Sequence, residues 1–222
     1  RTKFNLAVVI VFAVGLVITS IVSYVMEFQQ ARAEVEHEAE VLLSMALATR
    51  SYTVNEVRPL LWQLEEENDF LEATVPSFAA VQTFQIFNDE FSEFTYREAA
   101  LNPTNPRDLA RSWEVDIIQN MIARDSDDPV LGERQLEDSR IMYLARPIRI
   151  TDEGCLECHS TPDVAPAAMI AEYGADGGFG WQMQEIVGAQ IVAVPLSVAY
   201  EQARSSTLTL VGSLFSVFTL IL

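Results

Sequence analysis

A run of 23 residues without a single charge, FNLAVVIVFAVGLVITSIVSYVM, separates Lys3 from Glu27. A helix needs about 20 apolar residues to cross the hydrocarbon core of a bilayer. A cleaved signal peptide is the competing interpretation, but its apolar region is shorter and a small-residue cleavage site follows it. Here the run continues into EFQQARAEVEHEAE, which has helical character. We therefore expect residues 1–26 to form a retained transmembrane helix.

A second uncharged run, SSTLTLVGSLFSVFTLIL, follows Arg204 and reaches the last residue. Its length also suits a membrane helix. We expect residues 199–222 to form a second transmembrane helix. Because the chain stops on an apolar residue, we interpret it as a piece of a longer protein, and a tail anchor as the less favoured alternative.

The charges of the chain are distributed unevenly. Arg1 and Lys3 precede the first apolar run, and all 32 acidic residues lie between residues 27 and 204, where 12 arginines give a net charge of −20. Basic flanks stay on the cytoplasmic side, so we expect a cytoplasmic N-terminus in the inner membrane and a periplasmic segment between the spans. An acidic surface excludes nucleic acid as a partner and attracts a basic protein.

The periplasmic segment has the pattern of an α+β domain. Residues 27–60 are expected to form a long juxtamembrane helix with one apolar stripe, which packs on its own domain or pairs in a homodimer. A shorter helix is expected at residues 108–124. Alternating and β-branched runs predict strands at residues 140–150 and 185–196, within a domain of residues 61–198. The stripe comprises Phe28, Ala31, Val35, Ala39, Leu42 and Ala46.

The loop between these strands contains CLECH, residues 155–159, with both cysteines of the chain. A zinc site needs four ligands, and the only other histidine, His37, lies among glutamates on the long helix. A disulfide and a chance occurrence are two further readings. Covalent c-type haem explains most, because two thiols at this spacing add to the haem vinyl groups and the next histidine binds the iron. We expect one haem c per chain, attached to Cys155 and Cys158, with His159 as the proximal ligand.

The remaining contacts of the haem are less defined by the sequence. Met169, ten residues after His159, is the candidate for the sixth iron ligand that we would test first, although plain packing and an open site also fit. Haem propionates require cationic or amide partners, for which the candidates are Arg97, Asn102, Asn105 and Arg146.

Several runs of the chain follow one another in a recognisable order: RSYT and VRPLL after residue 50, YREAALNPTNPRDLARSWE, YLARPI, CLECHSTPDVAPAAMIAEYG, and GFGW followed by EIVGAQIVAVPL. Together they resemble one family, the c-haem PAS-like sensor domain. The resemblance covers about residues 30–200. It implies a PAS-like antiparallel sheet and one c-type haem between two transmembrane helices, ahead of a histidine kinase, cyclase or chemoreceptor module. Some relatives bind the iron through an upstream cysteine, which is missing here, where Ala99 and Ala100 stand nearby.

Two functions follow as hypotheses. The first is a membrane-anchored periplasmic haem sensor of redox state or of a small gas, which signals through the second span to an output module beyond residue 222. The alternative is a membrane-bound c-type cytochrome subunit that transfers electrons to a basic redox protein or within a larger membrane complex. The sequence contains no recognisable catalytic constellation, so an enzymatic role is left to a downstream kinase or cyclase module.

Overall fold

The computed structural model describes residues 2–62, 70–137 and 139–221. The chain divides into two compact units. The first comprises Arg1–Glu38, Gln135–Ile141 and Pro195–Leu222, and the second comprises Ala39–Arg134 and Met142–Val194. The chemistry predicted from the sequence falls in the second unit.

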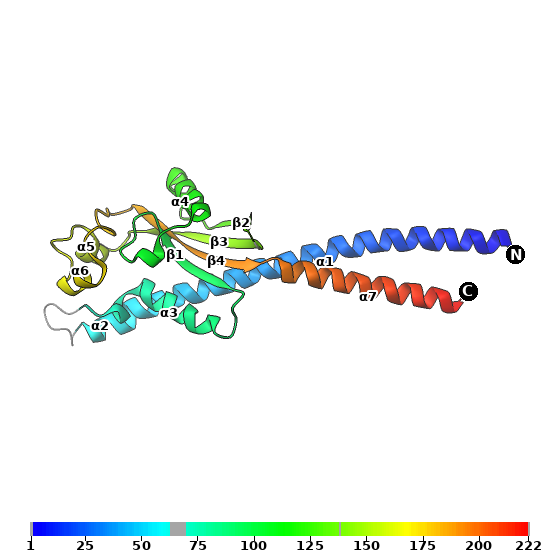
Figure 1. Cartoon of the computed structure of the whole chain (residues 1–222), viewed down its shortest axis with the longest axis horizontal. Helices are drawn as coiled ribbons and strands as arrows, with labels where there is room; N and C mark the ends of the chain where they lie inside the picture. Colours follow the sequence, from blue (N-terminus) through cyan, green and yellow to red (C-terminus); the bar gives the residue numbers. More distant parts are fainter. Residues whose placement is uncertain (1, 63–69, 138, 222) are drawn as a thin grey trace. The chain divides into compact units, whose positions relative to one another are not determined.

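The first unit consists mainly of two helices. The N-terminal part of α1 (Thr2–Tyr52) runs antiparallel to α7 (Ser197–Ile221), so that the two chain ends lie at the same end of the pair (Figure 1). Two aromatic stacks join the helices, Phe12 with Phe218 at 3.5 Å and Phe28 with Tyr200 at 4.8 Å between ring centroids.

Within the described residues, one helical stretch, Lys3–Leu61, is long and apolar enough to cross a membrane, although a signal sequence passes the same test. The second predicted span forms helix α7 and stays a prediction as a membrane segment.

The long helix changes its hydrogen-bond register just before Pro59. A π-helical turn, Thr53–Val57, follows α1, and a short helix, α2 (Arg58–Leu61), follows the turn. The amide of Arg58 donates to the carbonyl of Thr53, five residues back. Proline lacks an N–H, and its ring clashes with the carbonyl four residues earlier in an α-helix. The wider π-turn accommodates that ring, so the helical path continues to Leu61.

The apolar stripe of α1 is covered within the single chain. Ala31, Val35, Ala39, Leu42 and Ala46 are at most 8% exposed. Of the two interpretations of this stripe, packing within the chain is the one observed. A homodimer stays a prediction and would have to use another surface.

The second unit is built on a four-stranded antiparallel sheet in the order β1-β4-β3-β2 (Figure 1). The strands are β1 (Thr95–Ala100), β2 (Val130–Gln135), β3 (Arg140–Arg149) and β4 (Ile186–Pro195). The predicted strands correspond to β3 and β4. Strand β4 lies between β1 and β3 and is buried along nearly all its length. The α+β class is confirmed, and a PAS-like topology stays a prediction.

Helices cover the sheet. Ile117, Ile118 and Met121 of α4 (Ser112–Arg124) pack with Ala99, Ala145, Ile186, Ala189 and Ile191 of the sheet in one core cluster. The predicted helix at residues 108–124 begins later than expected, because Pro106–Asp108 forms a separate 3-10 turn. Helix α3 (Pro76–Asn88) and strands β1 and β2 were not predicted from the sequence.

Candidate functional site

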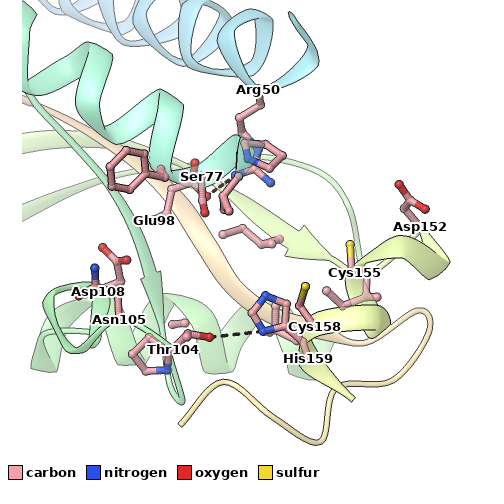
Figure 2. A pocket seen from close by; sticks show the side chains of 18 of the residues that line it. Arg50, Ser77, Glu98, Thr104, Asn105, Asp108, Asp152, Cys155, Cys158 and His159 are labelled. Atoms are coloured by element: carbon pink, nitrogen blue, oxygen red, sulfur yellow. Dashed lines mark hydrogen bonds and ion pairs between the residues drawn. The ribbon is translucent and has the colours of Figure 1, made fainter. Parts of the chain in front are cut away.

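A cavity of about 470 Å³ opens in the second unit beside the cysteine loop (Figure 2). Small-molecule and cofactor sites have volumes of roughly 300–1,000 Å³. The end of α1 and the turn after it supply Arg50, Ser51, Val54, Asn55 and Arg58 to its lining; the loop after β1 supplies Pro103, Thr104, Asn105, Arg107 and Asp108; the cysteine loop supplies Cys155, Cys158, His159, Met169, Tyr173 and Trp181. The cavity is therefore enclosed by segments that lie far apart in the sequence.

His159 ends the short helix α5 (Leu156–His159), and its ring orientation is fixed. Its Nδ1 lies 2.8 Å from the carbonyl oxygen of Gly178 and 3.3 Å from Oγ1 of Thr104. A carbonyl only accepts, so Nδ1 carries the proton and Nε2 keeps a free lone pair. The ring also stacks on Trp181, with centroids 3.9 Å apart.

The surroundings of His159 keep the imidazole neutral. Burial lowers its pKa, and the hydrogen bond to Gly178 opposes this effect only in part. A neutral imidazole whose other nitrogen donates to a carbonyl is the usual state of a metal-binding histidine. His159 is therefore prepared to bind a metal through Nε2.

Gly178 is the residue that allows this contact. Its φ is +80°, and a Cβ at this position would lie 1.9 Å from Oγ1 and 2.7 Å from the amide nitrogen of Thr104. Glycine alone tolerates both the conformation and the close approach. Its amide donates to Oδ1 of Asn102 at 3.3 Å. Asn102 thus supports the residue that holds His159 and does not itself line the cavity.

Neither cysteine forms a disulfide within the described residues, and their sulfur atoms lie on the same side of α5 as the His159 ring (Figure 2). Burial raises the pKa of Cys155, Asp152 raises it further, and Arg58 and Arg50 lower it only in part. A redox-active C-x-x-C pair instead has a lowered thiol pKa. Among the described residues no group of three or more His, Cys, Asp and Glu is placed to hold a metal ion. The cysteine pair and one imidazole are the chemistry that the loop presents.

A buried polar chain forms the wall of the cavity under helix α1. The guanidinium of Arg50 forms an ion pair with Glu98, and Tyr96 donates to the other carboxylate oxygen of Glu98 at 2.6 Å. The Glu98 side chain is 4% exposed. Burial is the largest influence and lowers the pKa of Arg50, but Glu98 and Tyr96 together with Cys155 raise it by more, so the pKa is raised overall. The wall therefore presents a permanent cation.

Only some of the residues predicted to contact the haem line the cavity. Asn105 lines the cavity, whereas Arg97 donates to Glu114 at 2.9 Å and Arg146 is exposed on β3, and neither arginine is among the lining residues. Met169 lines the cavity and is 2% exposed on α6 (Ala167–Tyr173). Three lining residues, Arg50, Arg58 and Arg107, were not predicted, because their positions in RSYTVNEVRP and NPTNPRD carry no spacing signal.

Arg107 is a lining arginine with an unused donor. Its Nε is buried without a hydrogen-bond partner among the described residues and lies 3.5 Å from Oδ1 of the neighbouring Asp108. Its guanidinium lies over the ring of Phe78 at 5.4 Å. A buried donor without an acceptor is costly, so this end of the cavity favours an anionic ligand group.

Comparison with known proteins connects this site to a family. No curated protein is a significant match. Among solved structures, the crystal structure of the cyanobacterial haem protein Tll0287 is similar, with 16% sequence identity, a TM-score of 0.47, and coverage of 67% of this chain and 92% of that chain. The model of the Tll0287-like family matches residues 28–195, which include the whole cavity and more than half of the sequence. The chain belongs to the Tll0287-like family.

Proposed function

We propose that this chain is a haem protein with one c-type haem, attached covalently through Cys155 and Cys158 and bound at its iron by His159. The observation that carries the proposal is the orientation of His159, whose Nδ1 is occupied by Gly178 and whose Nε2 is left for a metal. The similar cyanobacterial structure is described as a haem protein, which supports haem as the cofactor.

The residues present fit a haem. Two thiols at the required spacing and one neutral imidazole open on the same cavity. Asn105 and Asp108, which flank Arg107, lie at the far side of the cavity from Cys155 (Figure 2). The propionates lie on the edge of the porphyrin away from the vinyl groups, so Arg107 would meet one of them. Bound haem supplies an iron that changes oxidation state or takes a small ligand, and the chain fixes its position and charge.

We further propose a sensory role in which the haem domain is anchored in the inner membrane and faces the periplasm. Strand β4 ends at Pro195 and helix α7 begins at Ser197, with a single residue between them. The amide of that residue, Leu196, donates to the carbonyl of Arg140 at 2.9 Å. Because no flexible linker separates the two elements, a displacement of β4 can move α7 directly. The family match supports a haem domain, and this connection supports the sensor.

A second candidate is electron transfer within a larger membrane complex. The net charge of −20 between the predicted spans favours docking of a basic redox protein. Rapid reduction by a basic soluble cytochrome, slowed strongly by salt, would favour this role over the sensor.

Covalent attachment is tested on the full chain produced with a c-type haem maturation system. After denaturation and acid–organic extraction, a pyridine haemochrome spectrum should show haem still on the protein. Cys155→Ala with Cys158→Ala should lose it, and each single variant should keep one thioether bond. Haem that is extracted from the unmodified chain would contradict covalent attachment.

The sensory role is tested by distance measurement across α7. A spin label at Ser205→Cys, an exposed position on α7, reports the separation of two copies in a bilayer. We expect this separation to differ between ferric and ferrous protein. An identical separation in both states would exclude signalling through α7.

A further inference from the structure

Among the residues that the structure describes, the wall of the cavity that faces His159 contributes no ordinary iron ligand. Arg50 points down from α1 and His159 points up from α5 on opposite sides of the same cavity (Figure 2). The residues that α1 and the π-turn contribute to this wall are Arg50, Ser51, Val54, Asn55 and Arg58. They include no histidine, cysteine or methionine, the side chains that commonly bind haem iron.

From this arrangement we propose that the chain binds a small exogenous ligand between His159 and Arg50, an anion or a diatomic molecule that becomes negative at its outer atom. This inference rests on the proposed haem. Arg50 is the residue that selects such a ligand, because its guanidinium would donate to the ligand atom farthest from the iron. Cyanide and azide on ferric haem belong to this class, as does oxygen on ferrous haem, whereas bound carbon monoxide is a poor acceptor.

The guanidinium of Arg50 has N–H donors that are available to a ligand. A guanidinium carries five N–H groups, and within the described residues the Arg50 side chain uses one of them, from Nη1 to Glu98. The side chain is 24% exposed, on the cavity side. A hydrogen bond from a charged donor in such a partly desolvated place is worth about 1.5–3 kcal/mol.

Arg50 is also held in place before any ligand arrives. Glu98, accepting from Tyr96 as well, fixes the guanidinium from the sheet side. Such a preorganised donor spends no reorganisation energy on binding. Arg58 adds a second positive charge to the same wall, with Nε donating to the carbonyl of Thr74 at 3.2 Å and the guanidinium over Trp62 at 5.2 Å.

The experiment is an azide and cyanide titration of the ferric full-length haem protein in detergent, followed by the Soret absorbance. Arg50→Leu should raise the Kd of both anions by roughly tenfold to a hundredfold, the change that 1.5–3 kcal/mol implies. Arg50→Lys should give Kd values between those of the unmodified protein and Arg50→Leu. The affinity of the ferrous form for carbon monoxide should change by less than about threefold. Arg124→Leu, which removes an exposed arginine outside the cavity, is the matched control for net charge.

Arg50→Leu leaves Glu98 buried without its partner and can fail to fold. Arg50→Leu combined with Glu98→Gln removes both charges and keeps an acceptor for Tyr96, and it is compared with Glu98→Gln alone. Unchanged anion affinity in this pair would overturn the inference.

A second outcome would also overturn it. If the native haem is six-coordinate and inert to cyanide until Met169→Leu opens it, an internal ligand fills the position. Absence of haem in the unmodified chain, seen in the haemochrome spectrum, would instead refute the proposed function itself.

Discussion

Nδ1 of His159 lies 2.8 Å from the carbonyl oxygen of Gly178, so a glycine 19 residues downstream determines the protonation and direction of the imidazole. The backbone carbonyl fixes the tautomer, and Nε2 is exposed to the cavity as a result. The position of that carbonyl depends in turn on the positive φ of Gly178 and on its close approach to Thr104. The loop thus orients His159, the proposed iron ligand, through its backbone.

Gly178→Ala is expected to disturb the site more than its backbone strain explains. A methyl group there would lie 1.9 Å from Oγ1 of Thr104, so the loop must shift and the carbonyl must leave His159. We expect the haem content per folded protein to fall severalfold, measured by pyridine haemochrome. Gly174→Ala is the matched control, because Gly174 has φ +81° and open space around it. An alanine at either position costs about 1–3 kcal/mol of backbone strain. Equal haem loss in the two variants would contradict a specific effect of the clash with Thr104.

Trp181 is expected to set the ring plane of His159. Its indole stacks on the imidazole at 3.9 Å with an interplanar angle of 17°. Trp181→Phe keeps an aromatic face and should leave the ferric spectrum close to that of the unmodified protein. Trp181→Ala removes the stack and should broaden the low-temperature electron paramagnetic resonance signal of the ferric haem, because the ring then occupies several orientations. Identical signals in the two variants would show that Gly178 alone is sufficient.

Asp108→Asn is expected to stabilise the haem-free protein at neutral pH. Burial raises the pKa of Asp108, and the nearby Arg107 offsets this only in part. The folded state therefore holds the proton more tightly than the unfolded state, and the free energy of unfolding falls as pH rises from about 4 through the folded pKa. The asparagine side chain does not ionise, so the variant does not lose this stability as pH rises. Urea unfolding should show the variant more stable at pH 7, with the difference shrinking as pH falls towards 4, and a less stable variant at pH 7 would contradict the assignment.

Sequence reasoning was most successful where one segment carried its own signal. The long helix and strands β3 and β4 follow from local periodicity and were predicted. CLECH identified the three residues that now open on the cavity. Strand β1 was missed because Arg97 and Glu98 interrupt its apolar pattern. Glu98 pairs with Arg50 and Arg97 pairs with Glu114. These partners lie too far away in the sequence for a local pattern to reveal them.

The contacts across the cavity could not be predicted for a related reason. Arg50 and His159 are separated by 109 positions in sequence, and only the folded sheet places them on one cavity. The four polar residues proposed for the propionates were chosen by residue type alone. The structure places Asn105 in the lining, Asn102 behind Gly178, and the two arginines elsewhere. Residue type alone identifies side chains that could bind a propionate, but their hydrogen-bond and ion-pair partners in the folded chain determine which of them line the cavity.

Arg97→Ala is expected to lower stability without affecting haem binding. Glu114 is fully buried and accepts from Nε of Arg97 at 2.9 Å and from the amide of Arg111 at 2.7 Å. Loss of the guanidinium leaves the carboxylate charged and buried, which costs about 3 kcal/mol or more. Urea unfolding should show this loss, while the haem content of the folded fraction should stay constant. Arg97→Met combined with Glu114→Leu removes both charges and should recover most of the stability. If Arg97→Ala instead reduced haem content at unchanged stability, Arg97 would bind a propionate after all, through a rearrangement that frees it from Glu114.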